Sequence, residues 1–542
     1  MFCICLSLIL FVRSFNGILQ ASVTVNAGNV VGTNKLSLGF QLNSDWITWI
    51  DSSNEYRARS SSVQRELAQN AGFRLVRVFG TSSKLSLPPC TSWNETAKTG
   101  TWDWVHVDSL TQMIFEIGAE PLFCLGLLAQ NMSQVIPEGM AINSGTSLPY
   151  ADSWAAYCRE WVKHFKEIGL PVRFYETINE PWMYFYPPAG IDSRKLDYFK
   201  DVFNAAARAM RQENPNVFLG FDGSNRRGVL DYWLENGGEA LDFISFHKYD
   251  SGTVEQYSSE ELLSRAETYQ LTNSSYFYGI QDAREKYYDA RGKWIPVFNS
   301  ESNLDSASEA GTDPRIQQMV GAVWLALVLK TGILNGLDYS VYFNFGAYAH
   351  VERSSQASRG VGFGMINLDD NQPWYPYYVQ EMIGSNLAVG DQIVESTSSS
   401  PDFRSVAWVH NGKLNTLVIC KNDIADAFSL KLYGLQGTLN YSKIDNSITW
   451  DNESRTMQNG TMDSTGSLTM KGYTVALFQS LMPAMPLEEG FESSGFSKWT
   501  GTLIASGETA TVSAAKPCGD SYSVKFTTKR ARENGVTVRA KC

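Results

Sequence analysis

Residues that could bind a metal ion are scarce in this sequence. Its 542 residues include five histidines and eight cysteines, and the cysteines form no Cys-x-x-Cys pair. Zinc sites usually bring such residues together at short spacing, and no His-x-His follows the first predicted strand at residues 36–42. The sequence therefore predicts no metal centre and no metal-dependent hydrolase, and we expect the protein to need no cofactor.

The chain also lacks clustered positive charge and long apolar runs. Its net charge is −11, and no Lys/Arg-rich helix is present, so we expect no binding to nucleic acid. Beyond the N-terminal segment, no stretch has the roughly 18 consecutive apolar residues that a membrane-spanning helix needs. We therefore expect no membrane span, and the sequence leaves the oligomeric state open.

Residues 1–21 have the form of a secretory signal peptide. An apolar run at 2–12 is followed by Arg13, although no lysine or arginine precedes the run. Six Asn-x-Ser/Thr sequons would accept glycans in a secreted protein; they start at Asn94, Asn131, Asn273, Asn440, Asn452 and Asn459. We expect a secreted or extracellular glycoprotein.

Short apolar runs alternate with amphipathic stretches from residue 36 to 388, which is the pattern of β/α units. We count eight predicted strands, at 36–42, 75–79, 121–125, 172–178, 217–221, 243–247, 295–298 and 337–343. Eight units predict an α/β fold of the (β/α)8 TIM-barrel type, whose active site lies at the C-terminal ends of the strands. An open doubly wound sheet is the alternative, but no glycine-rich phosphate loop follows the first strand.

Helical periodicity disappears after residue 388, and alternating apolar runs predict an antiparallel β-sandwich at 389–481. Residues 22–35 are strand-like and precede the barrel, so we expect this N-terminal strand to join the sandwich. Residues 482–487 contain two prolines and form the predicted linker. We interpret 488–542 as a short all-β segment, a partial module of the carbohydrate-binding or laminin-G-like kind.

Two carboxylates follow predicted barrel strands. Asn179-Glu180-Pro181 ends the fourth strand, and Pro181 favours an extended backbone at Glu180. Glu301 follows the seventh strand, with Asp305, Glu309 and Asp222 as rival acids. Retaining glycoside hydrolases use such a pair, one carboxyl group as the acid and the other as the nucleophile. The alternative is that Glu180 only forms a structural ion pair and that Glu301 is only a solvated acid in a loop.

This arrangement resembles the large clan of retaining (β/α)8 glycoside hydrolases, clan A, and in particular families 39 and 79 and their relatives. The resemblance covers residues 36–480 and implies that Glu180 is the general acid/base, Glu301 the nucleophile and Asn179 the partner of the sugar 2-hydroxyl. Arg77 matches a second-strand arginine near the nucleophile, and His247-Lys248-Tyr249 matches a sixth-strand His-x-Tyr.

These residues do not assign the exact family. The fourth strand reads Glu-Thr-Ile-Asn-Glu-Pro-Trp, where family 39 β-xylosidases usually show Trp-Asn-Glu-Pro, and the eighth strand lacks the tryptophan found in many clan members. The resemblance thus implies a β-glycoside hydrolase acting by double displacement on a carbohydrate substrate. A non-catalytic carbohydrate-binding protein on the same barrel is the alternative.

Aromatic side chains crowd the predicted loops, and they suit the apolar faces of sugars. We expect Trp182 and Trp46 to contact substrate, because they follow the fourth and first strands. Lys248, Arg226 and Arg227 would recognise a uronic acid if they faced the cleft. The sugar, its linkage and exo or endo action depend on loop shape and stay open.

Overall fold

The computed structural model describes the barrel and the sheet beside it. The residues described are 19–42, 49, 55–79, 89–126, 136–186, 190–253, 256–306, 313–347, 362–423, 428–446, 456–482, 509–513 and 523–527. Trp46, most of the predicted signal segment and most of the predicted linker and C-terminal module lie outside these residues.

Eight parallel strands form the barrel, in the order β8-β7-β6-β3-β2-β11-β10-β9. They are β2 (Ser37–Leu42), β3 (Leu75–Phe79), β6 (Glu120–Cys124), β7 (Phe174–Glu176), β8 (Phe218–Gly220), β9 (Ile244–Ser251), β10 (Val297–Asp305) and β11 (Tyr339–Tyr342). A parallel bridge between Asp222 and Ser245 joins the two ends of this order, just beyond β8. The predicted (β/α)8 fold is confirmed, and each predicted strand overlaps one of these eight.

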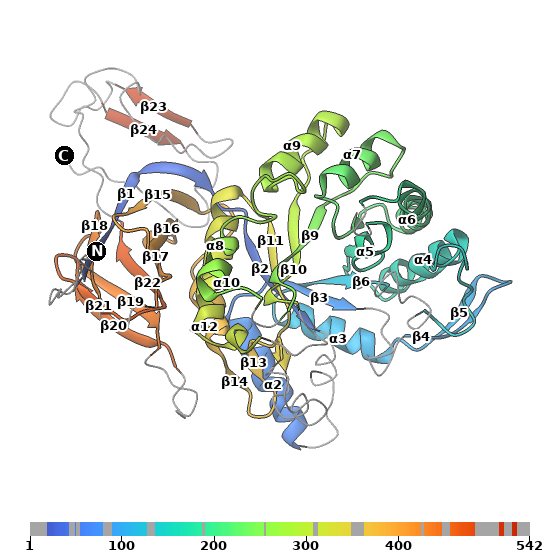
Figure 1. Ribbon diagram of the computed structural model, residues 1–542, viewed down its shortest axis with the longest axis horizontal. Coiled ribbons are helices and arrows are strands. Elements are labelled where there is room, and N and C mark those ends of the chain that lie inside the picture. The colour runs from blue at the N-terminus through green and yellow to red at the C-terminus, as the bar shows by residue number, and fades with distance from the viewer. Residues whose placement is uncertain are drawn as a thin grey trace, which may run out of the picture.

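Helices surround the barrel, and Figure 1 shows most of them on its outer side. They are α2 (Glu55–Asn70), α3 (Val105–Glu116), α4 (Ala151–Glu167), α5 (Trp182–Phe185), α6 (Ser193–Glu213), α7 (Arg227–Glu235), α8 (Ser259–Ala266), α9 (Ile280–Arg291), η3 (Pro314–Gln317), α10 (Met319–Asn335) and α12 (Tyr375–Gly384). In the described part of the chain, no helix has both the length and the apolar character to cross a membrane.

Inside the barrel, apolar side chains fill the layer nearest the strand N-termini. This cluster contains Leu75, Leu122, Phe174, Phe243, Phe298 and Val341. Side chains two residues apart on a strand face the same side. Arg77 therefore lies one layer above Leu75, and Glu176 lies one layer above Phe174. The strand pattern thus carries polar groups to the C-terminal end of the barrel, where the active site of this fold is built.

A nine-stranded sheet lies beside the barrel, in the order β20-β19-β22-β17-β16-β15-β1-β18-β21. Its strands are β1 (Leu19–Thr33), β15 (Gln392–Ser398), β16 (Phe403–His410), β17 (Lys413–Cys420), β18 (Phe428–Tyr433), β19 (Thr438–Ile444), β20 (Gln458–Asp463), β21 (Leu468–Met470) and β22 (Thr474–Leu481). Strand β1 pairs antiparallel with β15 and parallel with β18, so the N-terminal strand belongs to this sheet.

Small sheets complete the described elements. They are β4 (Cys90–Asn94) with β5 (Thr99–Trp102), β12 (Gly346–Ala347) with β13 (Ile366–Asn367) and β14 (Gln372–Pro373), and β23 (Thr509–Ser513) with β24 (Ser523–Thr527). The described cysteines, Cys90, Cys124, Cys158 and Cys420, are buried free thiols.

Both faces of the large sheet are buried along its central strands β16, β17 and β22. On β17, Leu417 and Ile419 pack into the core shared with the barrel helices, whereas Leu414 and Val418 pack into the sheet's own core. Helix α10 lies between the barrel and strands β16, β17 and β22, as Figure 1 shows. A helix enclosed in this way needs apolar side chains all round, which explains its sequence MVGAVWLALVLKTGILN.

Gly321 sets the position of α10 against η3. A Cβ at this residue would lie 2.1 Å from the carbonyl oxygen of Ile316 and 2.7 Å from that of Arg315. Both contacts are to backbone atoms, which cannot move aside as a flexible side chain does. Only glycine therefore allows this close approach.

We expect Gly321→Ala to destabilise the protein by about 1–3 kcal/mol, because the added methyl group overpacks the junction. The measurement is the urea concentration at the midpoint of unfolding. Gly32→Ala is the matched control, since a Cβ there meets no heavy atom within 4 Å. Equal midpoints for the two variants would contradict the role assigned to Gly321.

Candidate active site

Arg77 is the centre of a buried polar network at the C-terminal end of the barrel. Its guanidinium is fully buried and donates hydrogen bonds to four side chains, which lie on β2, on β10 and on or just after β7. The bonds run from Nε to Oε2 of Glu176 (2.9 Å), from Nη1 to Oε1 of Gln41 (2.6 Å) and Oε2 of Glu301 (2.7 Å), and from Nη2 to Oδ1 of Asn179 (2.7 Å).

The buried pair of Arg77 and Glu176 is ionised. Burial opposes the charge on Arg77, but the attraction of Glu176 and Glu301 outweighs it and raises the pKa of the guanidinium above its ordinary value. For Glu176, burial acts to raise the pKa, yet Arg77, His247 and the hydrogen bond from Ser245 hold it below its usual value. Glu176 therefore neutralises Arg77 deep in the barrel.

The sequence reasoning missed Glu176. It lies two residues after inward-facing Phe174 on β7, so strand periodicity placed an acid inside the barrel beside Arg77. The spacing of two residues from Phe174 is the signal that would have identified Glu176, whereas the prediction considered only Asn179 and Glu180 at the end of this strand.

Glu301 is held rigidly by two donors. Tyr249 donates from its hydroxyl to Oε1 (2.6 Å), and Arg77 donates to Oε2 (2.7 Å). Only 7% of Glu301 is exposed, and each of its carboxylate oxygens accepts one of these two hydrogen bonds. Tyr249 stays a neutral donor because burial and the Glu301 charge raise its pKa well above the ordinary value.

A β-bulge aims Glu301 into the barrel. Strand β10 runs to Asp305, so Glu301 lies within the strand rather than in a loop after it. Asn299 pairs with Phe246, but Glu301 pairs with His247, which makes Ser300 an extra residue. Without it, Glu301 would alternate to the outer face, since Phe298 faces inward. The bulge brings it level with His247.

Glu180 follows β7 in a strained backbone conformation. Its φ is 44°, in the left-handed region that residues other than glycine seldom adopt. The expectation of an extended geometry before Pro181 is therefore wrong. Pro181 instead begins the short helix α5, and the amide of Met183 donates to the Glu180 carbonyl. Such strain is typical of functional residues held in place by their surroundings.

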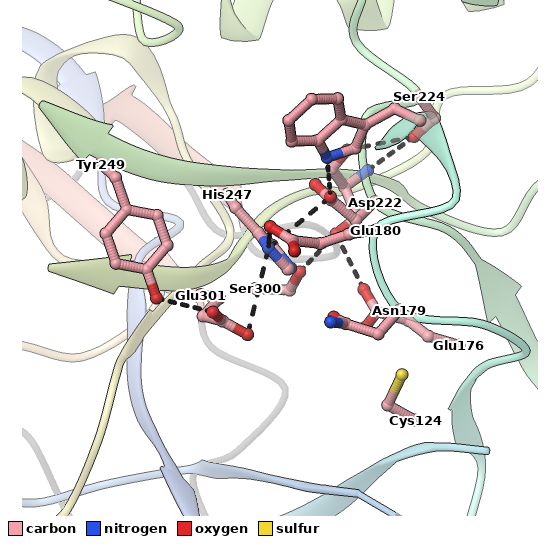
Figure 2. Close-up of polar contacts among 12 residues, drawn as sticks. Cys124, Glu176, Asn179, Glu180, Asp222, Ser224, His247, Tyr249, Ser300 and Glu301 are labelled. Carbon is pink, nitrogen blue, oxygen red and sulfur yellow. Dashed lines mark hydrogen bonds and ion pairs between the residues drawn. The ribbon is translucent and has the colours of Figure 1, made fainter. Parts of the chain in front are cut away.

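His247 lies between the two predicted catalytic carboxylates (Figure 2). Its Nδ1 is 3.1 Å from Oε1 of Glu180 and 3.9 Å from Oε2 of Glu301. Burial acts to lower the pKa of His247, but Asp222, Glu301 and the hydrogen bond to Glu180 raise it to about 9. At neutral pH the ring is an imidazolium that donates to Glu180.

Asp222 is a third acid of the site. It was a rival to Glu301, but it lies on the other side of His247, 3.6 Å from Nδ1, and accepts a hydrogen bond from Nε1 of Trp182 (2.8 Å). Burial, with Glu180 and Glu176 nearby, raises the pKa of Asp222 to about 7 although His247 opposes the shift.

Glu180, Asp222 and His247 also form a cluster of metal-type ligand atoms in the described part of the chain, all within 4.8 Å of one another. A metal ion would have to displace the proton that His247 donates to Glu180, because imidazole binds metals only in its neutral form. The raised pKa of His247 instead suits the cluster to proton chemistry.

A cavity of about 560 Å³ opens beside Glu180. Trp182, His247 and Tyr249 line it, as does Arg226. Lys248 and Arg227 do not line it. Lys248 is fully buried in an ion pair with Asp250, and Arg227 donates to Asn273 and the Ser274 carbonyl. A contact of these two residues with a uronic acid in this cavity is therefore not supported.

Disrupting the buried pair of Arg77 and Glu176 should cost far more than disrupting an exposed one. We expect Arg77→Met to destabilise the protein by about 3–5 kcal/mol, because Glu176 is left as an uncompensated buried charge. The double variant Arg77→Met/Glu176→Gln should be less destabilised than the sum of the single variants. The measurement is the free energy of unfolding in urea.

Arg208→Met is the control for this cycle, since its partner Glu239 forms an ion pair at the surface (3.0 Å, with Arg208 58% exposed). We expect it to cost less than about 1 kcal/mol. Additive single effects, or equal losses for Arg77→Met and Arg208→Met, would show that the buried pair is not coupled.

Removing the Asp222 charge should lower the pKa of His247 below about 9, because the attraction of Asp222 raises it. The folded pKa exceeds the ordinary value of 6.5, so protonation of His247 stabilises the fold. That stability is fully present below about pH 6.5 and is lost as the pH rises through about 9. In Asp222→Asn the loss should occur at lower pH.

Titration of ¹³C-labelled histidine by NMR measures this shift directly. Asp391→Asn is the control, because Asp391 pairs with His410 in the large sheet (2.9 Å) and not with His247. An unchanged His247 pKa in Asp222→Asn would contradict the assignment.

The fold of this site recurs in solved structures. A monomeric β-xylosidase from Caulobacter crescentus CB15 is 14% identical with a TM-score of 0.57, over 85% of this chain and 100% of that one. A GH39 enzyme from Xanthomonas axonopodis pv. citri is 14% identical with a TM-score of 0.58, over 88% of this chain and 100% of that one. An α-L-arabinofuranosidase from Thermotoga maritima is 14% identical with a TM-score of 0.57, over 85% of this chain and 100% of that one.

No functionally curated protein matches the sequence. The family model described as glycosyl hydrolases family 39 matches residues 31–410, which is more than half of the chain. The match runs from the end of β1 through the whole barrel to the end of β16. The chain therefore belongs to glycosyl hydrolase family 39 and is an O-glycosyl hydrolase.

Proposed function

We propose that this glycosyl hydrolase cleaves a β-linked glycoside by double displacement, with Glu301 as the nucleophile and Glu180 as the general acid/base. The observation that carries the proposal is the different environment of the two acids. Glu301 is fixed by two donors, Arg77 and Tyr249, whereas Glu180 faces the cavity and has its carboxylate against Nδ1 of His247.

In the first step, Glu301 attacks the anomeric carbon and its charge is consumed in the new C–O bond. Arg77 and Tyr249 each donate to one oxygen of Glu301 and so orient its carboxylate for this attack. Glu180 donates its proton to the departing oxygen, so that the leaving group departs as a neutral alcohol. The product of this step is a covalent glycosyl-enzyme.

In the second step, Glu180 removes a proton from water, which attacks the anomeric carbon and releases Glu301. The imidazolium of His247 lies against both carboxylates and stabilises whichever of them bears the negative charge. Asn179 binds Arg77 through Oδ1, so its Nδ2 amide is oriented to donate to a sugar hydroxyl. This supports the role of Asn179 at the sugar 2-hydroxyl.

The solved structures of similar fold include a β-xylosidase and an α-L-arabinofuranosidase. We therefore propose a pentose as the first glycone to assay. A panel of aryl β-glycosides that differ in the sugar identifies the glycone the enzyme prefers.

The two roles separate when the leaving group is varied. We expect Glu180→Gln to lower kcat/KM by about 10²–10⁴-fold on a phenyl glycoside, but far less on a 2,4-dinitrophenyl glycoside, whose leaving oxygen needs no proton. Glu301→Gln should lower kcat/KM by at least about 10³-fold on both, because the covalent step is lost. Release of the phenol measures the rates.

Glu285→Gln is the control, since Glu285 is exposed on α9, away from the cavity. It should retain wild-type rates on every substrate. Wild-type activity no higher than that of the Glu301→Gln variant would refute the proposed function, and equal losses on both leaving groups for Glu180→Gln would refute its role as the acid.

A further inference from the structure

Arg226 is a cavity cation without an anionic partner. It lies after β8, immediately before α7, and lines the same cavity as Glu180. Within the described residues, no carboxylate lies within ion-pair distance of Arg226, and its buried Nε has no hydrogen-bond partner. Burial lowers the pKa of this guanidinium, and the more distant charge of Asp222 does not make up the difference. Arginine nonetheless stays charged at neutral pH.

Aromatic rings hold the Arg226 guanidinium in place. Its Cζ lies 4.1 Å from the ring centroid of Trp182, 4.9 Å from that of Phe277 and 5.1 Å from that of Tyr186. Stacking of this kind leaves the edge of the guanidinium plane available for hydrogen bonds. The arginine is therefore positioned in advance, which reduces the entropy cost of binding a ligand.

Trp182 is itself fixed. Its indole nitrogen donates to Asp222 (2.8 Å), and its ring packs against Gly223, where a Cβ would lie 2.9 Å from Cδ1. Gly223 has a φ of 79°, so glycine is needed here for both the backbone and the packing. The position of Arg226 thus depends on a chain of contacts that runs from Asp222 through Trp182.

The acids of the cavity already have partners. Asp250 pairs with Lys248 and accepts from Nε1 of Trp324, and Glu180 accepts from His247. The other arginine of the cavity, Arg265, lies 3.7 Å from Asp250. Of these charges, the one left without a counter-ion is Arg226.

The cavity lies on the leaving-group side of the reaction, given the proposed roles of Glu180 and Glu301. Glu180, the proposed acid, lines it and must contact the leaving oxygen, whereas Glu301 is not among the lining residues. A group bound against Arg226 therefore belongs to the part of the substrate that departs, and not to the sugar that is attached to the enzyme.

We propose that Arg226 binds an oxyanion on the leaving group, so that the substrate is a β-glycoside whose departing sugar bears a carboxylate, as in a uronic acid, or a sulfate ester. A guanidinium edge matches the two oxygens of either group. This inference rests on the proposed function, because that function assigns the leaving-group side.

Matched aryl glycosides of the preferred glycone test the inference. The charged substrates carry 3-carboxyphenyl or 3-sulfophenyl leaving groups, and their neutral isosteres carry 3-carbamoylphenyl or 3-sulfamoylphenyl. For each pair the measured quantity is the ratio of kcat/KM values, charged over neutral. We expect a wild-type ratio of about ten or more for at least one pair, the size of a charge-assisted hydrogen bond. The pair with the larger ratio shows whether Arg226 prefers a carboxylate or a sulfur oxyanion, for which the sulfonate stands in.

Arg226→Gln should lower that ratio about tenfold while it leaves kcat/KM on the neutral isosteres within a few-fold of wild type. Arg226→Lys should retain part of the preference, since the charge remains but the planar edge is lost. Arg227→Gln is the matched control, because Arg227 stacks on Tyr278 in the same way (4.2 Å) but does not line the cavity. It should keep the full preference.

Comparing ratios corrects for differences in folding between variants, because both substrates report on the same folded fraction. Wild-type ratios near one for both pairs, or a preference that survives in Arg226→Gln, would overturn the inference. Failure of the proposed function is distinguishable, since the neutral isosteres would then not be hydrolysed at all.

Discussion

The ion pair of Arg77 and Glu176 supports the rest of the site. Neither residue could be fully buried alone, because a lone charge in the barrel interior is too costly. Together they form a pair with no net charge. Arg77 uses its remaining N–H donors to bind Glu301, Asn179 and Gln41. Glu301, the proposed nucleophile, is thus oriented by an arginine whose own charge is balanced by Glu176.

The barrel and the large sheet are joined as closely as two halves of one domain. Helix α10 is covered by both, and β17 contributes alternate side chains to each of the two cores. The reason is geometric: a helix that is apolar on all sides is stable only when it is enclosed. The sheet therefore stabilises the scaffold that holds the active-site strands, even though none of its residues lines the cavity beside Glu180.

Strand periodicity predicted much of this structure, and departures from it explain the rest. The eight strands follow from apolar runs that alternate with amphipathic stretches, whereas Arg77 and Tyr249 were predicted from the resemblance to clan A. Side-chain alternation along β9 would also have shown that Lys248 faces away from His247 and Tyr249. The inward turn of Glu301 depends on the bulge at Ser300, which no local pattern announces. The left-handed backbone of Glu180 arises because tertiary contacts override the preference that Pro181 imposes.

At Glu180 the needs of the backbone and of the chemistry are opposed. Its φ of 44° is one that glycine adopts freely, but glycine has no carboxylate to offer. The chain therefore accepts a less stable residue at the position where we propose that a proton is transferred. Selection for stability alone would favour glycine here, so the strained glutamate supports the catalytic role that we propose for it.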